Sequence, residues 1–333
     1  MGFGLRNAVG YRGALFALLL WGVMYAPGSV RRRQVGPSVA AFPPTDQAEV
    51  CTAVAFMFHH IFPDAETPIL LSGGVQVRYV PGRLSVTRAQ FLGLIRELLR
   101  RGYWFPSPQQ FLSCVRDTAA DGCAEPYAIL IVDDPWNVPF IPVEDVRAIG
   151  QEAGVPVHVW AAIATRRITP AETAFLSENL DVLHPVSHSA SHNMHLSDWL
   201  DQGREAEVVA ELEESQQFIA RMDPGGSRIF VYPGGNQSAA LVRWVARYYD
   251  AAFLASPLLL ADDDETWCLN RAIPRHRYLL PRLNGAHWPS TMHLWDRPEG
   301  QDAPDRHQRA PQGPGFWAWG LFRWLRALWR AVH

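Results

Sequence analysis

The sequence predicts an α/β fold, in which parallel strands alternate with helices. Its clearest sign is an unbroken apolar run at 127–132 that ends on two adjacent carboxylates, Asp133 and Asp134. Such a run is typical of a strand covered on both faces, as in a parallel sheet. A helical stripe at 143–151 and a second apolar strand at 155–164 follow, so strand, helix and strand alternate. This alternation fits an α/β barrel or a doubly wound sheet.

The other expected elements follow from the same periodicities. A first strand is expected near Val54, and apolar residues between Leu92 and Leu99 predict a helix that ends at Gly102. Further along the chain we expect a helix, a short strand, a second helix and a short strand, at 205–222, 229–232, 241–249 and 251–255.

Length and composition limit the classes of function. A chain of 333 residues with 48% hydrophobic content is long enough for one large domain or two small ones. The formal net charge of −3 argues against a nucleic-acid-binding surface, so no nucleic-acid partner is expected.

A histidine-rich segment, 186–195, lies further along the chain than the carboxylate pair. His188 and His192 are spaced i, i+4, so on a helical turn both imidazoles would project from one face. Two imidazoles and one carboxylate leave an open position for water, as catalytic metal sites do. A solvated helix start is the alternative, because His184 and His195 are also present. The carboxylate pair alone would also suit a cap or a turn.

The segment 228–235, R-I-F-V-Y-P-G-G, runs from a short strand into a Pro-Gly-Gly loop. Glycines let backbone N–H groups approach a ligand closely, and such groups stabilise an oxyanion.

In this order, the three segments resemble the motifs of the polysaccharide deacetylase family, also called NodB-homology or carbohydrate esterase 4 domains. The family carries an Asp-Asp strand end, a His-Ser/Thr-x-x-His segment and a Tyr/Phe-Pro-Tyr-Gly-like loop. Positions 133–134, 188–192 and 232–235 match them. Weaker echoes are its opening strand at 53–61 and its two helices within 85–113. The likeness spans residues 50–285.

The resemblance implies a distorted (β/α) barrel of about seven parallel strands. It also implies a hydrolase that removes N-acetyl groups from amino sugars of an envelope or exported polysaccharide. Its divalent metal, most often zinc, would be held by Asp134, His188 and His192. Cobalt, nickel and iron suit the same ligands. Asp133 would be the general base.

Further site residues are carried over from the same motifs. The backbone N–H of Gly234, which stands where the family has tyrosine, would stabilise the oxyanion. Tyr232, Pro233 and Trp136 would contact the substrate.

The sequence departs from the family pattern at three points. Pro135 stands where the family has glycine, which removes a backbone donor. Arg228 lies near the position of the arginine that orients the base. The late Leu-x-His motif, which supplies the general acid, has no clear match, and His276, His287 and His293 are candidates by position, with His276 preferred.

Two other functions remain open. The chain could hydrolyse another non-peptide C–N bond on the same fold. It could also be a catalytically weak glycan-binding or membrane-tethered assembly protein, which the missing acid would favour.

The amino-terminal residues 1–33 are expected to form a signal peptide or a signal anchor. Arg6 and Arg12 precede an uncharged apolar run at 13–30, the pattern of an export signal. At about 18 residues the run is just long enough to span a bilayer. Because three arginines follow it, an uncleaved anchor is an alternative to a cleaved signal. The domain should then be exported or membrane-anchored, with the extracytoplasmic side favoured.

The expected domain order is a linker at 34–48, a deacetylase-like catalytic domain at 49–296, a Pro/Gly-rich linker at 297–315 and an amphipathic helix at 316–333. In that helix, basic residues on one face stand opposite tryptophan and leucine, which is typical of a helix lying in a membrane interface. Docking on a partner or on the domain itself is the alternative.

The four cysteines, at 51, 114, 123 and 268, match no zinc-ribbon spacing. In an oxidising compartment Cys114 and Cys123 could form a disulfide. The alternative is four free cysteines.

Overall fold

The computed structural model describes residues 52–71, 74–81, 84–116, 125–225, 227–254, 269 and 277–287. All of them belong to one compact unit, residues 48–333. Its centre is a parallel sheet with the strand order β10-β9-β8-β7-β6-β1-β11. The strands of this sheet are β1 (Ala53–Phe58), β6 (Tyr127–Asp133), β7 (Val159–Ile163), β8 (Leu183–Ser187), β9 (Ile229–Val231), β10 (Ala251–Phe253) and β11 (Leu283–Asn284).

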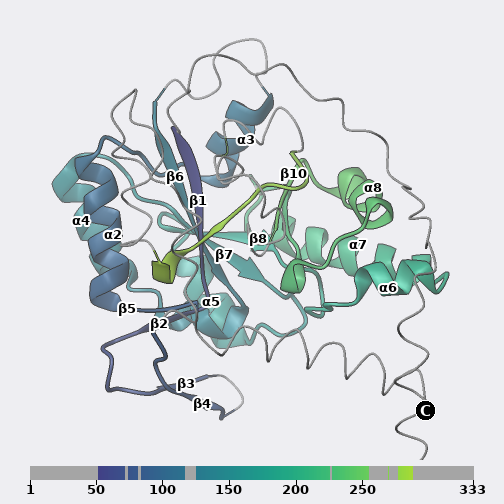
Figure 1. Ribbon diagram of the computed structural model, residues 1–333, viewed down its shortest axis with the longest axis horizontal. Helices are drawn as coiled ribbons and strands as arrows, with labels where there is room; N and C mark the ends of the chain where they lie inside the picture. Colours follow the sequence, from purple (N-terminus) through teal and green to yellow (C-terminus); the bar gives the residue numbers. More distant parts are fainter. Residues whose placement is uncertain are drawn as a thin grey trace, which may run out of the picture. The chain divides into compact units, whose positions relative to one another are not determined.

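Helices cover the outside of this sheet, with α2 and α4 on one side and α7 and α8 on the other (Figure 1). The helices are α2 (Arg88–Arg100), α3 (Pro108–Arg116), α4 (Val143–Ala153), α5 (Pro170–Glu178), α6 (Leu196–Asp201), α7 (Glu205–Met222) and α8 (Ala239–Tyr248). Short 3-10 turns are η1 (Pro135–Phe140), η2 (Pro233–Gly235) and η4 (Gly285–His287).

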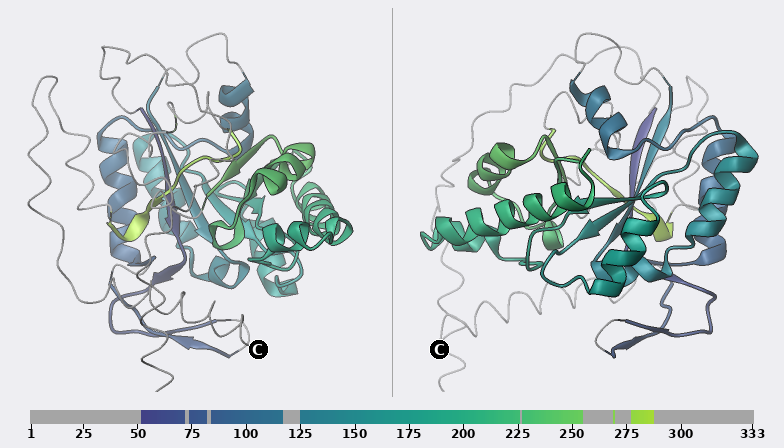
Figure 2. Two further views of the ribbon diagram at one scale, coloured as in Figure 1. Left: turned by 45° about the vertical axis from the view of Figure 1, so that its right-hand side comes forward. Right: turned by 180° about the vertical axis from the view of Figure 1, so that it is seen from behind.

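Four short strands lie between β1 and α2. They are β2 (His60–Phe62), β3 (Ile69–Leu70), β4 (Gln76–Val77) and β5 (Ser85–Thr87). β3 and β4 form an antiparallel hairpin, and β2 pairs with β5. In all three views the hairpin lies at the end of the molecule opposite α3 (Figures 1 and 2). Because β1 runs from the α3 end toward β2, the hairpin end is where the parallel strands terminate.

Successive strand residues pack into different cores, because side chains alternate across a sheet. Ile129 and Ile131 of β6 pack with Phe111 of α3 on one face. Leu130 and Val132 pack on the other, beneath α2 and α4. Since both faces are buried, the run carries no polar alternation.

The sheet curls strongly around the first of these cores. Trp160 of β7 and Phe253 of β10 have ring centroids only 5.8 Å apart, although β8 and β9 separate their strands in the sheet. Phe111 of α3 contacts both rings, at 5.5 and 5.6 Å. This aromatic group therefore fills the inside of the curled sheet at the α3 end.

The two edges of the sheet meet in one segment, 280–284. Leu280 pairs in parallel with Phe253 of β10, and three residues later Leu283 pairs with Phe56 of β1. Gly285, which follows this segment, lies against Phe58 so closely that a Cβ atom there would stand 1.9 Å from the ring. Glycine is required for this approach. The segment thus closes the sheet into the expected distorted barrel of parallel strands.

The structure confirms the predicted fold class and most predicted elements. The apolar run lies in β6, and the helix at 205–222 is found as α7. α2 begins earlier than its apolar stripe, at Arg88, because Thr87 and Gln90 form a capping box. The strand expected at 155–164 is shorter, since β7 begins only at Val159.

The predicted terminal segments, 1–33 and 316–333, and both predicted linkers lie outside the described residues. Within the described part of the chain, no helix is long and apolar enough to cross a membrane. Cys114 is disulfide-bonded, so the alternative of four free cysteines is wrong. Its partner lies outside the described residues, and pairing with Cys123 stays a prediction.

Candidate metal centre

The two carboxylates at the end of β6 have very different surroundings. Asp133 keeps the strand register and points into the barrel, where both its oxygens accept hydrogen bonds from Arg282, at 2.6 and 3.0 Å. Both side chains are buried. Burial acts to raise the pKa of Asp133, but the charge and the hydrogen bonds of Arg282 outweigh it and lower that pKa to about 2. Asp133 is therefore an ionised, firmly oriented carboxylate.

Asp134 leaves the strand geometry with a φ of +74°, a backbone conformation that non-glycine residues rarely adopt. Its backbone N–H still donates to the Ala162 carbonyl on β7, at 3.1 Å. The side chain is buried, and its Oδ1 has no hydrogen-bond partner. Burial and the charge of Asp133 raise the pKa of Asp134 to about 7, against the opposing charges of Arg167 and Arg282. A buried carboxylate oxygen without a donor is costly unless a cation binds it.

His188 follows β8 and continues its inward register. Its Nδ1 lies 2.8 Å from the Val231 carbonyl on β9, so this nitrogen carries the proton and donates it. The Nε2 lone pair is then free for a ligand, which is the usual arrangement at a metal-binding histidine. Burial lowers the pKa of His188 to about 3, which keeps the imidazole neutral.

His192 reaches the same place through a loop, not through the helical turn that the i, i+4 spacing suggested. That expectation was wrong, because Ser189 and His192 have φ values of +62° and +59°, which reverse the chain. The two imidazole rings nevertheless lie side by side, with centroids 4.8 Å apart. Burial also lowers the pKa of His192.

The ligand atoms of Asp134, His188 and His192 all lie within 4.8 Å of one another. His192 Nε2 is 3.1 Å from Asp134 Oδ1, yet this oxygen makes no hydrogen bond. The two atoms are close but are not joined by a hydrogen bond, which leaves both of them able to bind a shared cation. Two neutral imidazoles and a carboxylate arranged in this way fit a divalent cation with an open coordination position. The residues predicted as metal ligands are thus brought together.

Two neighbouring elements fix the end of β6. Asn137 of η1 is buried, and its Nδ2 donates to the Asp133 backbone carbonyl at 2.7 Å. Its Oδ1 lies 2.7 Å from His60 Nδ1. β2 is thereby tied to the carboxylate pair.

His59, at the end of β1, also faces this site. The charges of Asp133, Arg282 and His192 all act on its pKa, although burial, the largest influence, lowers it. Its Nδ1 is buried without a hydrogen-bond partner among the described residues. His59 is therefore a neutral imidazole with a nitrogen available for proton transfer.

Trp136 stands at the edge of the site, as the sequence suggested. Its ring is half-buried and meets His192 edge-on, with centroids 6.0 Å apart. The guanidinium of the exposed Arg167 lies 6.0 Å from the same ring. An aromatic face and a cation thus border the candidate metal centre.

The loop after β9 presents backbone more than side chains. Strand alternation turns Tyr232 outward, so its side chain is fully buried with Phe230 and Leu212 beneath α7. Pro233 is buried as well, whereas Gly234 is exposed and has a φ of +60°. The positive φ favours glycine at position 234, because a side chain there would be strained. Substrate contacts by Tyr232 would have to come from its backbone.

Of the remaining predicted positions, the structure describes the side chain of Arg228 alone. His276 and His293 fall outside the described residues. For His287, the last residue of η4, the structure describes only the backbone. Arg228 is not the arginine beside the base. It precedes β9, at the end of the strands away from the site, and donates to the Tyr248 carbonyl at 3.0 Å.

Sequence reasoning missed three residues that contact or face the site: His59, Asn137 and Arg282. The histidine follows the first predicted strand and could have been found by asking what stands at each strand end. Asn137 acts through hydrogen bonds that no sequence pattern indicates. Arg282 is 149 positions from its partner Asp133, and only the closed barrel joins them.

No model of a protein family and no curated protein matches the sequence. Solved structures do resemble it. A polysaccharide deacetylase from Bacillus cereus aligns with a TM-score of 0.49 at 14% identity, over 69% of this chain and 64% of that one. The Streptococcus pyogenes deacetylase PplD aligns with a TM-score of 0.47 at 14% identity, over 62% and 85%. A de-N-acetylase from Aggregatibacter actinomycetemcomitans aligns with a TM-score of 0.47 at 13% identity, over 69% and 94%. The chain therefore spans less than two thirds of the length of the Bacillus cereus protein.

Proposed function

We propose that this chain is a metal-dependent hydrolase that removes N-acetyl groups from the amino sugars of an exported polysaccharide. The observation that carries the proposal is the convergence of Asp134, His188 and His192 beside a second, ion-paired carboxylate, Asp133. The resemblance of the three motifs to polysaccharide deacetylases supports the choice of reaction.

In the proposed mechanism, Asp134, His188 and His192 hold a divalent ion, with zinc preferred for this ligand set. When bound, such an ion polarises a carbonyl and lowers the pKa of a coordinated water. Asp133 accepts the proton of the attacking water. Its fixed pairing with Arg282 orients the carboxylate and keeps it ionised.

The oxyanion and the leaving amine need further groups. Gly234 presents its backbone at the exposed turn after β9, where its N–H would donate to the oxyanion. His59 is the described residue best placed to relay a proton, because its buried Nδ1 has no hydrogen-bond partner among the described residues. It would accept the proton that Asp133 takes from the water and, as an imidazolium, donate it to the leaving nitrogen. His276 remains a candidate for this role from outside the described residues. Trp136 offers a flat face on which a sugar ring would stack.

We further propose that the domain works outside the cytoplasm, held near a membrane by residues 1–33 and by the helix expected at 316–333. A disulfide at Cys114 supports an oxidising compartment.

The test is acetate release by the purified full-length protein from N-acetylglucosamine oligomers and partly acetylated glycans. The protein is first stripped of metal and then supplied with zinc or cobalt. We expect release that depends on the metal and is reduced roughly a hundredfold or more in Asp133→Asn, the loss typical of removing a general base. Bound metal without release from any of these glycans would contradict the proposal. Amide or formamide hydrolysis would then be tested, and glycan binding without hydrolysis would indicate a binding protein.

A further inference from the structure

We propose that Glu211 is a positioning residue of the metal centre, which holds the loop 188–192 in the shape that brings His192 beside His188. The proposal rests on the metal-binding part of the proposed function but not on the choice of substrate. Glu211 lies on α7 and is no part of the ligand set.

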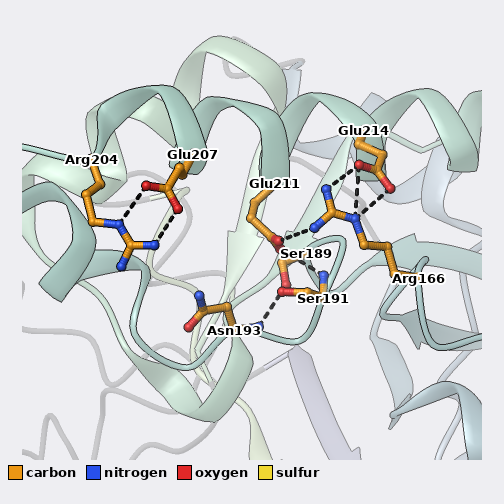
Figure 3. Close-up of polar contacts among 8 residues, drawn as sticks. All are labelled: Arg166, Ser189, Ser191, Asn193, Arg204, Glu207, Glu211 and Glu214. Atoms are coloured by element: carbon orange, nitrogen blue, oxygen red, sulfur yellow. Dashed lines mark hydrogen bonds and ion pairs between the residues drawn. The ribbon is translucent and has the colours of Figure 1, made fainter.

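The contacts of Glu211 are those of a buried clamp. Only 2% of its surface is exposed. One carboxylate oxygen, Oε2, accepts a hydrogen bond from the backbone N–H of Ser191 at 2.8 Å, and the other, Oε1, lies 3.1 Å from Arg166 Nη1. Figure 3 shows the carboxylate between these two partners. The negative charge is thus paired with Arg166, and the hydrogen bond from Ser191 reaches the residue next to His192.

Arg166 holds the same loop from the other side. Its backbone N–H donates to the Ala190 carbonyl at 2.7 Å, and that of Thr165 donates to the Ser189 carbonyl at 3.3 Å. The side chain of Arg166 continues to Glu214, with its Nε 2.9 Å from Oε1 (Figure 3). Residues that follow β7 and a residue in the middle of α7 therefore both hydrogen-bond to the segment between His188 and His192.

This grip matters because the loop has an unfavourable backbone. Ser189 and His192 are non-glycine residues with positive φ, and such conformations persist only where surrounding contacts impose them. His188 has its own anchor in the Val231 carbonyl. Among the described residues, no backbone carbonyl anchors the His192 ring in this way, so its place in the ligand set depends on the loop. Loss of the Ser191 hydrogen bond should weaken metal binding more than it weakens folding.

The test compares metal affinity in purified full-length variants by zinc titration calorimetry. Glu211→Ala removes the acceptor, and we expect a roughly 10- to 100-fold weaker Kd, the usual effect of deleting an outer partner of a metal ligand. Glu211→Gln keeps an amide oxygen that can accept from Ser191, so its Kd should stay within a fewfold of wild type, at about threefold or less. Glu214→Ala is the matched control, because it removes a partner of Arg166 that does not touch the loop, and its Kd should not change.

Several results would overturn the proposal. Wild-type affinity in Glu211→Ala would show that the clamp is not needed, and equal losses in Glu211→Gln and Glu211→Ala would assign the effect to charge. If Glu211→Ala does not fold, Glu211→Asp takes its place: the charge remains but the shorter side chain cannot reach Ser191, and unchanged affinity would contradict the proposal. A wild-type protein that binds zinc but releases no acetate would refute only the substrate, whereas one that binds no zinc would refute the metal centre and this clamp together.

Discussion

At the scale of single residues, adjacent carboxylates of identical chemistry are given opposite properties. Asp133 faces a buried guanidinium, and its pKa falls to about 2. Asp134 faces no such partner, and burial beside a neighbouring negative charge raises its pKa to about 7. The arrangement separates a carboxylate that is ionised at neutral pH from one whose ionised form needs a cation. Each role follows from what lies within hydrogen-bond distance.

The raised pKa of Asp134 predicts how the metal-free protein responds to pH. An acid with a folded pKa near 7 and an ordinary value of 3.8 stabilises the fold fully below about pH 4, and this stabilisation is lost as the pH rises toward 7. In urea unfolding with chelator present, wild type should therefore lose up to about 4 kcal/mol relative to Asp134→Asn between these pH values, at about 1.4 kcal/mol per pKa unit.

The comparison between variants isolates this carboxyl group, because the buried histidines titrate in both proteins. Asp201→Asn, which removes an exposed carboxylate on α6, serves as the control and should follow wild type. Parallel stability curves for wild type and Asp134→Asn across this pH range would contradict the raised pKa.

At the scale of elements, local signals decide where helices begin. α5 starts with a capping box in which the Thr169 hydroxyl accepts from the Glu172 N–H at 3.2 Å and the Glu172 carboxylate accepts from the Thr169 N–H at 2.7 Å. Thr169→Ala should cost about 1 kcal/mol of unfolding free energy in urea. Thr169→Ser keeps the hydroxyl and should lose much less, so equal losses in the two variants would show that the cap is unimportant.

The same element shows why sequence patterns found some segments and missed others. Strands β1 and β6 and helices α4 and α7 follow strong periodicities, and they were predicted. α5 carries its signal in the cap at Thr169 and in Pro170, not in an apolar stripe. β8 contains Pro185, which normally argues against a central strand. There, the Pro185 carbonyl faces Ser227, before the ladder to β9 begins at Ser187, so the missing N–H costs no ladder bond.

The residues of the candidate site also differ in how far the sequence could predict them. Its three ligands lie in short motifs, and the end of a parallel strand is a known place for functional residues, so they could be predicted. The loop conformation at His192 could not be predicted, because the i, i+4 spacing suits a helix equally well. The loop is selected by its hydrogen bonds to Arg166 and Glu211. The sequence offers Arg228 only as an arginine near the expected position, and it lies at the other end of its strand. Sequence patterns do not indicate contacts between residues that lie far apart in the chain and meet only when the barrel closes.

At the scale of the whole domain, the segment that closes the barrel also contributes a side chain to the candidate metal centre. The segment 280–284 pairs with β10 at one end and with β1 at the other. Between these pairings Arg282 points inward, where it donates to the Leu254 carbonyl at 2.6 Å and to both oxygens of Asp133. The ion pair between Asp133 and Arg282 is therefore part of the packing inside the barrel.

This coupling predicts a non-additive pair of substitutions. Arg282→Met leaves the Asp133 carboxylate buried without a partner, which should cost about 3–5 kcal/mol of unfolding free energy. In an Asp133→Asn background the neutral amide needs no cation, so the same Arg282→Met change should cost at least about 1 kcal/mol less. Urea unfolding of wild type, both single variants and the double variant closes the cycle.

The outcome also separates two explanations for the contribution of Arg282 to stability. If Arg282 acts mainly through its hydrogen bond to the Leu254 carbonyl, both backgrounds should lose the same free energy, and the coupling between closure and base would be refuted. If the ion pair dominates, Arg282→Met alone should also raise the pKa of Asp133. Stability would then fall less steeply with acid than in wild type, because the wild-type carboxylate, with its lowered pKa, stabilises the fold above about pH 4 and loses that contribution as the pH falls toward 2.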